Sequence, residues 1–122
     1  MREIFFRGKG INDKEWRYGF YTEKQGYPYI TPDGVAMYEI DANTAGQYTG
    51  FVDKNGKKIF EGDIVCMDDW IPPCMQVAYA QGAFYLAEIE KPVKYYGDIY
   101  YLNHGGNPCA KVIGNIYDDL SY

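Results

Sequence analysis

The chain has 122 residues, of which 47% are hydrophobic and 18% aromatic, with 14 tyrosines. This length favours one domain, residues 1–122, and the apolar content is enough for a buried core, which excludes a disordered chain. The formal net charge of −5 at pH 7 argues against general binding of duplex DNA, because that binding depends on a basic surface.

The cysteines and the start of the chain bear on the compartment. Cys66, Cys74 and Cys109 are an odd number without a close pair, so we expect free thiols that pack as small apolar side chains. Charged residues interrupt the apolar run at the start of the chain, so no signal peptide is expected. No stretch approaches the roughly 18 consecutive apolar residues of a membrane span. These features favour a reducing cytoplasm and no membrane attachment.

Short apolar runs predict strands in the first part of the chain. Residues 4–6 and 16–21 are expected to form a hairpin, and alternation in the second segment places Trp16, Tyr18 and Phe20 on one face of the sheet. Several Pro and Gly residues in 23–34 predict a loop with at most a short extended piece at residues 29–30. Residues 35–40 are apolar enough for a further strand.

The middle of the chain carries a hairpin signal. Asn55-Gly56 lies between arms rich in β-branched and aromatic residues, 48–52 and 59–60. A two-residue turn of type I′ needs positive φ at both central positions, which Asn tolerates and Gly adopts freely. We therefore expect a type I′ hairpin here, followed by a strand over residues 64–67.

The remaining segments continue the same pattern. Residues 75–79 and 84–86 alternate around Gln81-Gly82 and predict another hairpin. Residues 91–107 fit no clear period, and both a strand and one helical turn near 99–102 are consistent with them. Residues 111–117 predict the last strand, with a bulge at Gly114, and we expect it to pair close to the N-terminal half.

Together these elements predict a mainly β, all-β fold. The strands are short, turn signals recur at roughly ten-residue spacing, and no long 3.6-residue period is present. A small barrel or a sandwich is typical of such a pattern. Closing the sheet would remove exposed edge strands, which otherwise invite aggregation.

Three separated motifs resemble one known family. They are the start REIFFRGK (residues 2–9), the central QYTG (47–50) with DKNGKKIFEGDIV (53–65), and the ending VIGNIY (112–117). In this order they resemble the YopX family of small proteins from bacteriophages and prophages. The resemblance implies a mostly β protein with an SH3-like small barrel, additional N-terminal strands and little helix, encoded by a phage or prophage. Together with the cysteines and the charged start of the chain, it leads us to expect the cytoplasm of a bacterial host as the compartment. The resemblance implies no activity.

Candidate catalytic and metal-binding residues are few. His104 is the only histidine and Ser121 the only serine, and no Gly-x-Ser-x-Gly motif is present. Cys109 lies five positions after His104, but spacing alone does not show that the two side chains meet. Scattered cysteines lack the short paired spacings of a zinc site. We therefore expect a protein that is not an enzyme and needs no cofactor or metal.

Two functions are favoured, and both use the aromatic residues; a third, a small enzyme, would require His104 to lie within hydrogen-bond reach of Cys109 or of a buried carboxylate in a cleft. The first is a non-catalytic protein-interaction module that binds a host or phage protein, or itself as a homo-oligomer, because Tyr suits interfaces. The candidate binding residues are Trp70, Tyr95, Tyr96, Tyr100 and Tyr101. The alternative is binding of single-stranded nucleic acid through the same tyrosines and Lys91, Lys94 and Lys111, which the negative net charge disfavours.

Overall fold

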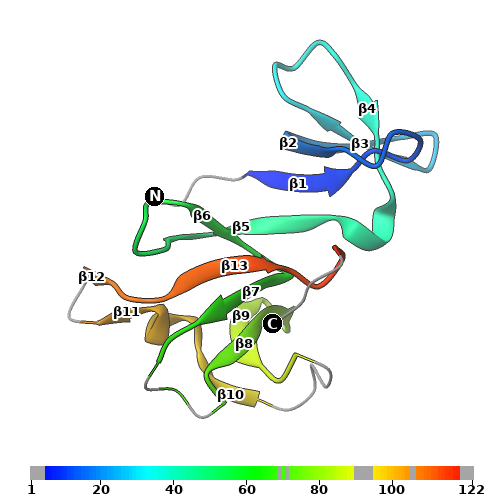
Figure 1. Ribbon diagram of the computed structural model, residues 1–122. Helices are drawn as coiled ribbons and strands as arrows, with labels where there is room; N and C mark the ends of the chain where they lie inside the picture. The colour runs from blue at the N-terminus through cyan, green and yellow to red at the C-terminus, as the bar shows by residue number, and fades with distance from the viewer. Residues whose placement is uncertain (1–4, 69, 71, 90–94, 105–106, 119–122) are drawn as a thin grey trace. The chain divides into compact units, whose positions relative to one another are not determined.

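The computed structural model describes residues 5–68, 70, 72–89, 95–104 and 107–118, with the side chains of residues 96, 101, 103, 104 and 107 left outside the description. In these ranges the chain consists of short antiparallel strands with two short 3-10 helices, so the expected mainly β class is confirmed. The chain divides into two compact units, Met1–Tyr48 and Thr49–Tyr122, each described by itself below (Figure 1).

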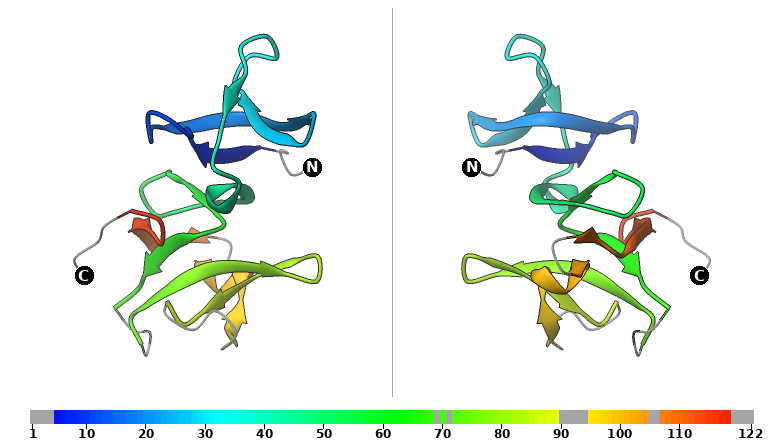
Figure 2. Two further views of the ribbon diagram at one scale, coloured as in Figure 1. Left: turned by 90° about the vertical axis from the view of Figure 1, so that its right-hand side faces the viewer. Right: turned by 90° about the vertical axis from the view of Figure 1, so that its left-hand side faces the viewer.

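The first unit is an antiparallel sheet. The sheet has six strands in the order β4-β3-β2-β1-β5-β6, of which the end of β5 and all of β6, Lys58–Phe60, are counted with the second unit. The other bounds are β1 Phe6–Lys9, β2 Trp16–Lys24, β3 Tyr27–Thr31, β4 Tyr38–Glu39 and β5 Gly46–Val52, with the 3-10 helix η1 at Ala42–Thr44. Figure 2 shows β1 running along the first part of the longer β2. The predicted N-terminal hairpin is confirmed, although its first strand begins at Phe6 instead of residue 4.

The loop predicted over residues 23–34 is wrong for Tyr27–Thr31, which forms β3, and the short extended piece expected at residues 29–30 lies within this longer strand. Gln25 and Gly26 both have positive φ, 54° and 83°, which is the geometry of a tight two-residue hairpin turn. The second half of β2 offers an edge, and β3 pairs with it from Phe20↔Thr31 to Lys24↔Tyr27. Pro28 is tolerated in this strand, where its carbonyl accepts a hydrogen bond from the Ile40 N–H at 3.1 Å.

The strand predicted over residues 35–40 is mostly absent. Only Tyr38–Glu39 pairs as β4, and Ile40 makes an isolated bridge to Gly10. Ile30 and Ile40 are both fully buried and form the apolar centre of this unit. The position of residues 35–40 therefore depends on the burial of the Ile40 side chain and not on a six-residue strand with alternating faces.

The second unit contains a five-stranded antiparallel sheet in the order β10-β9-β8-β7-β13. The bounds are β6 Lys58–Phe60, β7 Asp63–Cys66, β8 Cys74–Ala80, β9 Ala83–Ala87, β10 Tyr95–Asp98, the 3-10 helix η2 Ile99–Leu102, β11 Asn103–His104, β12 Asn107–Pro108 and β13 Lys111–Asn115. The predicted β8–β9 hairpin is confirmed. For residues 99–102, the helical alternative is the correct one.

One hydrophobic cluster supports this second unit. It contains the buried side chains of Ile59, Val65, Met75, Val77, Phe84, Leu86, Ile99, Leu102, Ala110 and Val112. Phe51 and Trp70 are half-buried and pack against the cluster. At about 25 cal/mol per Å² of apolar area removed from water, burial of this kind is the main favourable contribution to folding.

The β5–β6 hairpin is present, but its turn differs from the predicted type I′. Gly56 has φ of 84°, whereas Asn55 is not among the residues with positive φ. The Gly56 N–H donates to the Asp53 carbonyl at 2.9 Å, and the Asp53 carboxylate accepts from Asn55 N–H and Lys57 N–H. The Asp53 side chain therefore organises this turn, an interaction that the Asn-Gly pair alone does not reveal.

Two of the three cysteines form a disulfide, so the expectation of three free thiols is wrong. Cys66 ends β7, Cys74 begins β8, and the two residues are directly opposite each other in the strand pairing. The intervening connection folds back on itself, with Met67 N–H donating to the Pro73 carbonyl at 2.9 Å. Cys109 is half-buried and takes no part in a disulfide.

The last strand also pairs differently from the prediction. The bulge at Gly114 is confirmed by a register shift between Val112 and Gly114. However, β13 pairs with β7, residues 63–66, instead of a strand close to the N-terminal half (Figure 1). Among the described residues, β10 and β13 are the two ends of an open sheet, so barrel closure is not seen there.

Candidate functional site

The predicted aromatic patch is distributed over three elements. Tyr95 lies at the start of β10 and Tyr100 in η2, and their side chains are 58% and 73% exposed. Trp70 lies in the β7–β8 connection, where it packs against the core. The side chains of Tyr96 and Tyr101 lie outside the described residues. The structure thus presents Tyr95 and Tyr100 to solvent and gives Trp70 a packing contact.

Both exposed tyrosines are held by neighbouring groups. The Tyr95 hydroxyl is 3.0 Å from an Asp98 carboxylate oxygen, and its ring centroid is 6.0 Å from that of Tyr85. The Tyr100 ring meets Phe51 edge to face, with the centroids 5.5 Å apart. Because such contacts restrict the rings before any partner arrives, less side-chain entropy is lost on binding.

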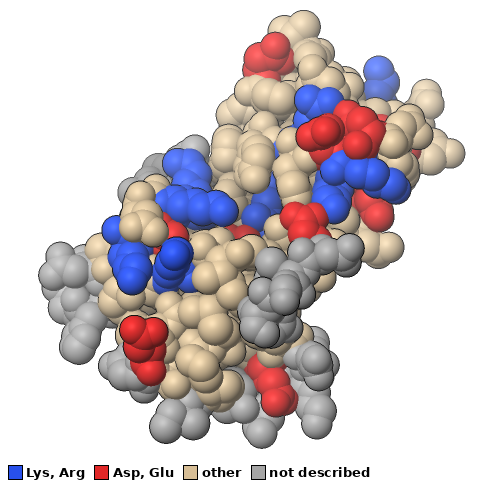
Figure 3. Space-filling model, in the orientation of Figure 1, with Lys and Arg blue, Asp and Glu red and all other residues tan. Residues whose placement is uncertain are grey.

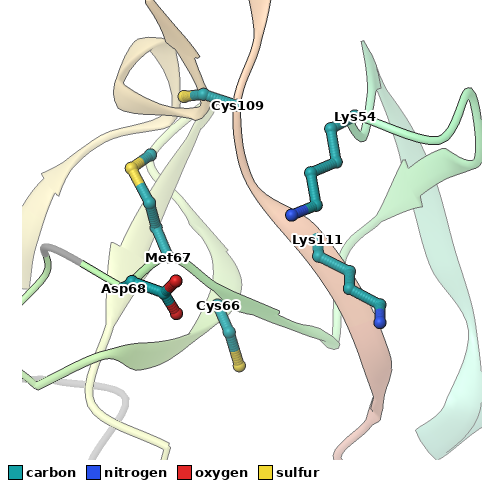
Figure 4. Close-up of a pocket in the computed structure, with 6 residues that line it drawn as sticks. All are labelled: Lys54, Cys66, Met67, Asp68, Cys109 and Lys111. Carbon is teal, nitrogen blue, oxygen red and sulfur yellow. The ribbon is translucent and has the colours of Figure 1, made fainter.

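A pocket of about 270 Å³ lies next to η2. Its lining residues are Lys54, Cys66, Met67, Asp68, Cys109 and Lys111 (Figure 4). Cys109 connects the pocket to η2, because its backbone N–H and its thiol both donate to the Leu102 carbonyl, at 3.0 and 3.1 Å. One lining residue of the pocket is therefore hydrogen-bonded to the last residue of η2, the helix that contains Tyr100.

The chemistry of this pocket is that of a charged recognition site. Figure 4 shows the Lys54 side chain reaching in from the β5–β6 turn, with Met67 and Asp68 on the opposite side. Lys54 and Lys111 supply two positive charges and Asp68 one negative charge, so the lining is positive on balance and favours an anionic group. The Cys66 sulfur is part of the disulfide, and the Cys109 thiol is engaged with Leu102, so neither sulfur is poised as a nucleophile.

A second pocket, of about 210 Å³, lies in the first unit between the β1–β2 turn and β4. Two of its charged side chains are paired, since Arg17 lies 2.7 Å from Asp13, and the Arg17 guanidinium also lies over the Tyr38 ring at 4.2 Å. The pKa of Asp13 is lowered, first by the backbone N–H of Glu15 and then by Arg17. Because Arg17, the cation of this lining, is already engaged and Glu39 adds a negative charge, the pocket offers little to an anionic ligand.

The first unit also exposes aromatic side chains on one sheet face. Directly opposite residues of an antiparallel pair project to the same side, and so do residues two apart along a strand. The register of β2 with β3 therefore gathers the residues of what we term the β2–β3 aromatic face: Trp16, Tyr18, Phe20, Tyr27 and Tyr29. Sequence alternation predicted the first three, whereas the last two were assigned to a loop.

Comparison with known proteins gives a family. The family model described as YopX protein matches residues 6–120, nearly the whole chain. The chain belongs to the YopX family. No curated protein matches it. The YopX match spans both compact units, so the additional N-terminal strands belong to the family pattern together with the five-stranded sheet.

Two further observations describe this YopX chain. Within the described residues, no group of three or more His, Cys, Asp or Glu side chains is placed to hold a metal ion. In the same part of the chain, no helix is long and apolar enough to cross a bilayer. Figure 3 shows basic and acidic side chains side by side on the first unit, and a group of basic side chains gathered on one side of the second unit.

Proposed function

We propose that this YopX protein is a non-catalytic protein-interaction module. The proposal depends on one observation. Tyr100 is 73% exposed to solvent, although its ring is held in contact with Phe51. Phe51 itself packs against the core, so the exposed ring stands on a rigid base. Exposed, pre-ordered tyrosines are typical centres of protein-binding surfaces, because they add contact area at low entropic cost.

The pocket beside η2 narrows the chemistry of the partner. Lys54 and Lys111 line it and are both exposed, and Cys109, a third lining residue, is hydrogen-bonded to the Leu102 carbonyl at the end of η2. A partner that places an apolar or aromatic group on Tyr100 and a carboxylate near the two ammonium groups would use both features. We therefore propose an acidic segment of a host or phage protein as the partner, with a second copy of the chain as the alternative occupant.

We also propose that the second unit contains an SH3-like barrel. Strands β7 to β10 follow one another as a meander, η2 follows, and β13 returns to pair with β7. This order supports an SH3-like barrel component in the second unit. Hydrogen bonds across a closed seam, detected by NMR, would support it, and freely exchanging amides along the β10 edge would contradict it.

We propose a phage or prophage origin and the host cytoplasm as the compartment. Because that compartment is reducing, Cys66 and Cys74 would carry thiols there and would form the disulfide only on oxidation. Thiol trapping in intact host cells tests this point. Trapping of both cysteines supports a cytoplasmic location, and a disulfide that persists in the cell contradicts it.

A binding experiment tests the function. The purified chain is immobilised and exposed to a host lysate, a captured protein is identified and purified, and its affinity is measured by calorimetry. Tyr100→Ala is expected to weaken binding by about 30-fold or more, the effect of removing a central aromatic residue. Tyr79→Ala is the matched control, because Tyr79 is 44% exposed and also meets a phenylalanine, Phe84, edge to face.

The outcomes separate the possibilities. Loss of binding with Tyr100→Ala and retention with Tyr79→Ala supports the proposal. Absence of any saturable partner, or equal affinity of the two variants, contradicts it. Light scattering on the same samples identifies self-association, which Tyr100→Ala is expected to abolish if a second copy occupies the surface.

A further inference from the structure

The β2–β3 aromatic face has a regular spacing. Residues two apart along a strand are separated by roughly 6.6 Å, so Tyr18 and Phe20 stand next to each other on β2, as do Tyr27 and Tyr29 on β3. Phe20 is opposite Thr31, which makes Tyr29 its diagonal neighbour across the pair. The aromatic side chains therefore form one continuous row across the hairpin.

Three of the five rings in this row are exposed to solvent, and Trp16 and Tyr29 are half-buried. Phe20 and Tyr27 are each 56% exposed, and Tyr18 is 42% exposed. A phenylalanine has no polar atom with which to satisfy water, so its exposure on a paired strand costs free energy in the unbound protein. By contrast, the opposite face of the same hairpin carries Ile30, which is fully buried. The apolar core of the unit thus lies on one face and the exposed aromatic row on the other.

Charges on these strands are also divided between the two faces. The pairing Arg7↔Tyr18 and Lys9↔Trp16 places both cations of β1 on the aromatic face, and Lys24↔Tyr27 adds a third at the end of the hairpin. The one carboxylate within β1, β2 and β3, that of Glu23, projects to the other face because it is opposite Pro28. On the edge strand β4, Glu39 is opposite Tyr29. The pairing of β3 with β4 therefore places this one carboxylate on the aromatic face.

The cations lie close to aromatic rings. The Arg7 guanidinium is 4.7 Å from the Trp16 ring centroid, and the Lys9 ammonium is 5.7 Å from it. Arg7 is 3% exposed and serves mainly to hold Trp16, whereas Lys9 is half-exposed and Lys24 is exposed. The row of rings thus has an accessible ammonium group near each end, Lys9 beside Trp16 and Lys24 beside Tyr27.

We propose that the β2–β3 aromatic face binds single-stranded nucleic acid. Bases stack on Tyr18, Phe20 and Tyr27, and phosphates lie beside Lys9 and Lys24. Stacking needs flat exposed rings on a firm support, and a sheet surface with neighbouring cations supplies both. Positive charge beside the rings, from half-exposed Lys9 and exposed Lys24, favours a polyanionic occupant over an apolar segment of a protein. The inference goes beyond the proposed function, because it concerns the other unit and none of the residues invoked there.

The electrostatic contribution to nucleic-acid binding can be measured from the salt dependence of the affinity. Each phosphate of a single strand that is neutralised contributes roughly −0.7 to the slope of the logarithm of the binding constant against the logarithm of salt concentration. Lys9 and Lys24 would neutralise two phosphates, so the expected slope is about −1.4. Lys24→Gln should change this slope by about 0.7 towards zero. Lys57→Gln, at an exposed hairpin tip of the other unit, should leave the slope unchanged.

Fluorescence anisotropy with a labelled oligothymidine tests the proposal with the full chain. Phe20→Ala and Tyr27→Ala are each expected to weaken binding by about 5- to 150-fold, the range for removal of one stacked base contact. Tyr79→Ala is the control, because it removes a tyrosine of similar exposure from the second unit. Circular dichroism and light scattering on every variant establish that it is folded and report its oligomeric state.

A second readout locates the strand without any substitution. An oligonucleotide with photoreactive iodouracil is crosslinked to the wild-type chain, and the crosslinked peptide is sequenced by mass spectrometry. Crosslinks within residues 16–29 support the proposal. No saturable binding at low salt, crosslinks confined to residues 49–122, or undiminished binding by both Phe20→Ala and Tyr27→Ala would overturn it. A dimer that Phe20→Ala dissociates, without nucleic-acid binding, would also overturn it and assign the face to a second copy.

Discussion

The carboxylate of Asp53 accepts a hydrogen bond from the backbone N–H of Val112, 59 residues further along the chain, at 3.1 Å. The same side chain accepts from Asn55 N–H at 2.8 Å and from Lys57 N–H at 2.9 Å. One buried side chain therefore shapes the β5–β6 turn and ties it to β13. Lys54, the next residue, reinforces the attachment through its N–H to the Ala110 carbonyl at 2.9 Å.

Replacing Asp53 should destabilise the second unit strongly. Asp53→Ala leaves three backbone donors without their acceptor, and we expect the free energy of unfolding to fall by about 2–4 kcal/mol. Asp53→Asn keeps one acceptor oxygen and should cost less. Urea denaturation followed by far-UV circular dichroism measures both. A loss below about 0.5 kcal/mol for Asp53→Ala, the usual range of surface substitutions, would show that the side chain is not the organiser of this turn.

The same residue predicts an acid dependence of stability. Burial, the largest single influence, would raise the pKa of Asp53, but hydrogen bonds from Val112, Lys57 and Asn55 together outweigh it, and the pKa lies below the ordinary value of 3.8. The stabilisation is therefore fully present above that value and is lost as the pH falls through the lowered pKa. Asp53→Asn should flatten the stability profile below about pH 4. An unchanged slope there would place the acid sensitivity elsewhere.

The Cys66–Cys74 disulfide should contribute to stability under oxidising conditions. It closes a loop of sequence separation 8, for which the loop-entropy model gives about 2–3 kcal/mol. Cys66→Ser and Cys74→Ser should each lower the free energy of unfolding by about this amount, and reduction of the wild type should have the same effect. Cys109→Ser is the control. Alkylation of the unfolded, unreduced chain should label one cysteine, and labelling of three would contradict the pairing.

Gly19 should tolerate no side chain. Its φ is +155°, and a Cβ there would lie 2.6 Å from the Thr31 carbonyl oxygen and 2.7 Å from the Pro32 Cα, both backbone atoms that cannot move aside cheaply. Gly19→Ala should therefore disrupt the end of the β2–β3 pairing. Gly26→Ala is the matched comparison, because its φ is +83° but nothing lies within 4 Å. That variant should lose only about 1–2 kcal/mol. Hydrogen exchange of the β3 amides distinguishes the two, and equal protection in both variants would contradict the close approach.

The sequence predicts the fold correctly where a strand pairs with its neighbour along the chain, because the residue pattern and the pairing are then both local. The β8–β9 hairpin follows from alternation around Gln81-Gly82, and the Gly114 bulge from a glycine within a strand. Pairing between distant segments was the harder part. Pro28 made β3 look like a loop, because nothing local shows that β2 extends far enough to pair with it. The choice of β7 as the partner of β13 is likewise a tertiary effect.

The same distinction applies to the candidate surfaces. Composition predicted that tyrosines would be exposed, but the support of Tyr100 by Phe51 depends on a contact across 49 positions, the difference between 51 and 100. The β2–β3 aromatic face was half visible in the alternation of Trp16, Tyr18 and Phe20. Tyr27 and Tyr29 joined it only once β3 was paired. The disulfide was missed because Cys66 and Cys74 meet across two strands whose pairing was not foreseen.

The central claim is that Tyr100 is exposed for binding and not for folding. The most direct measurement combines affinity for the purified partner with the free energy of unfolding, both on Tyr100→Ala. We predict a free energy of unfolding within about 1 kcal/mol of wild type, since little of the ring is buried, and an affinity lower by about 30-fold or more. Wild-type affinity in a folded Tyr100→Ala variant would contradict the account.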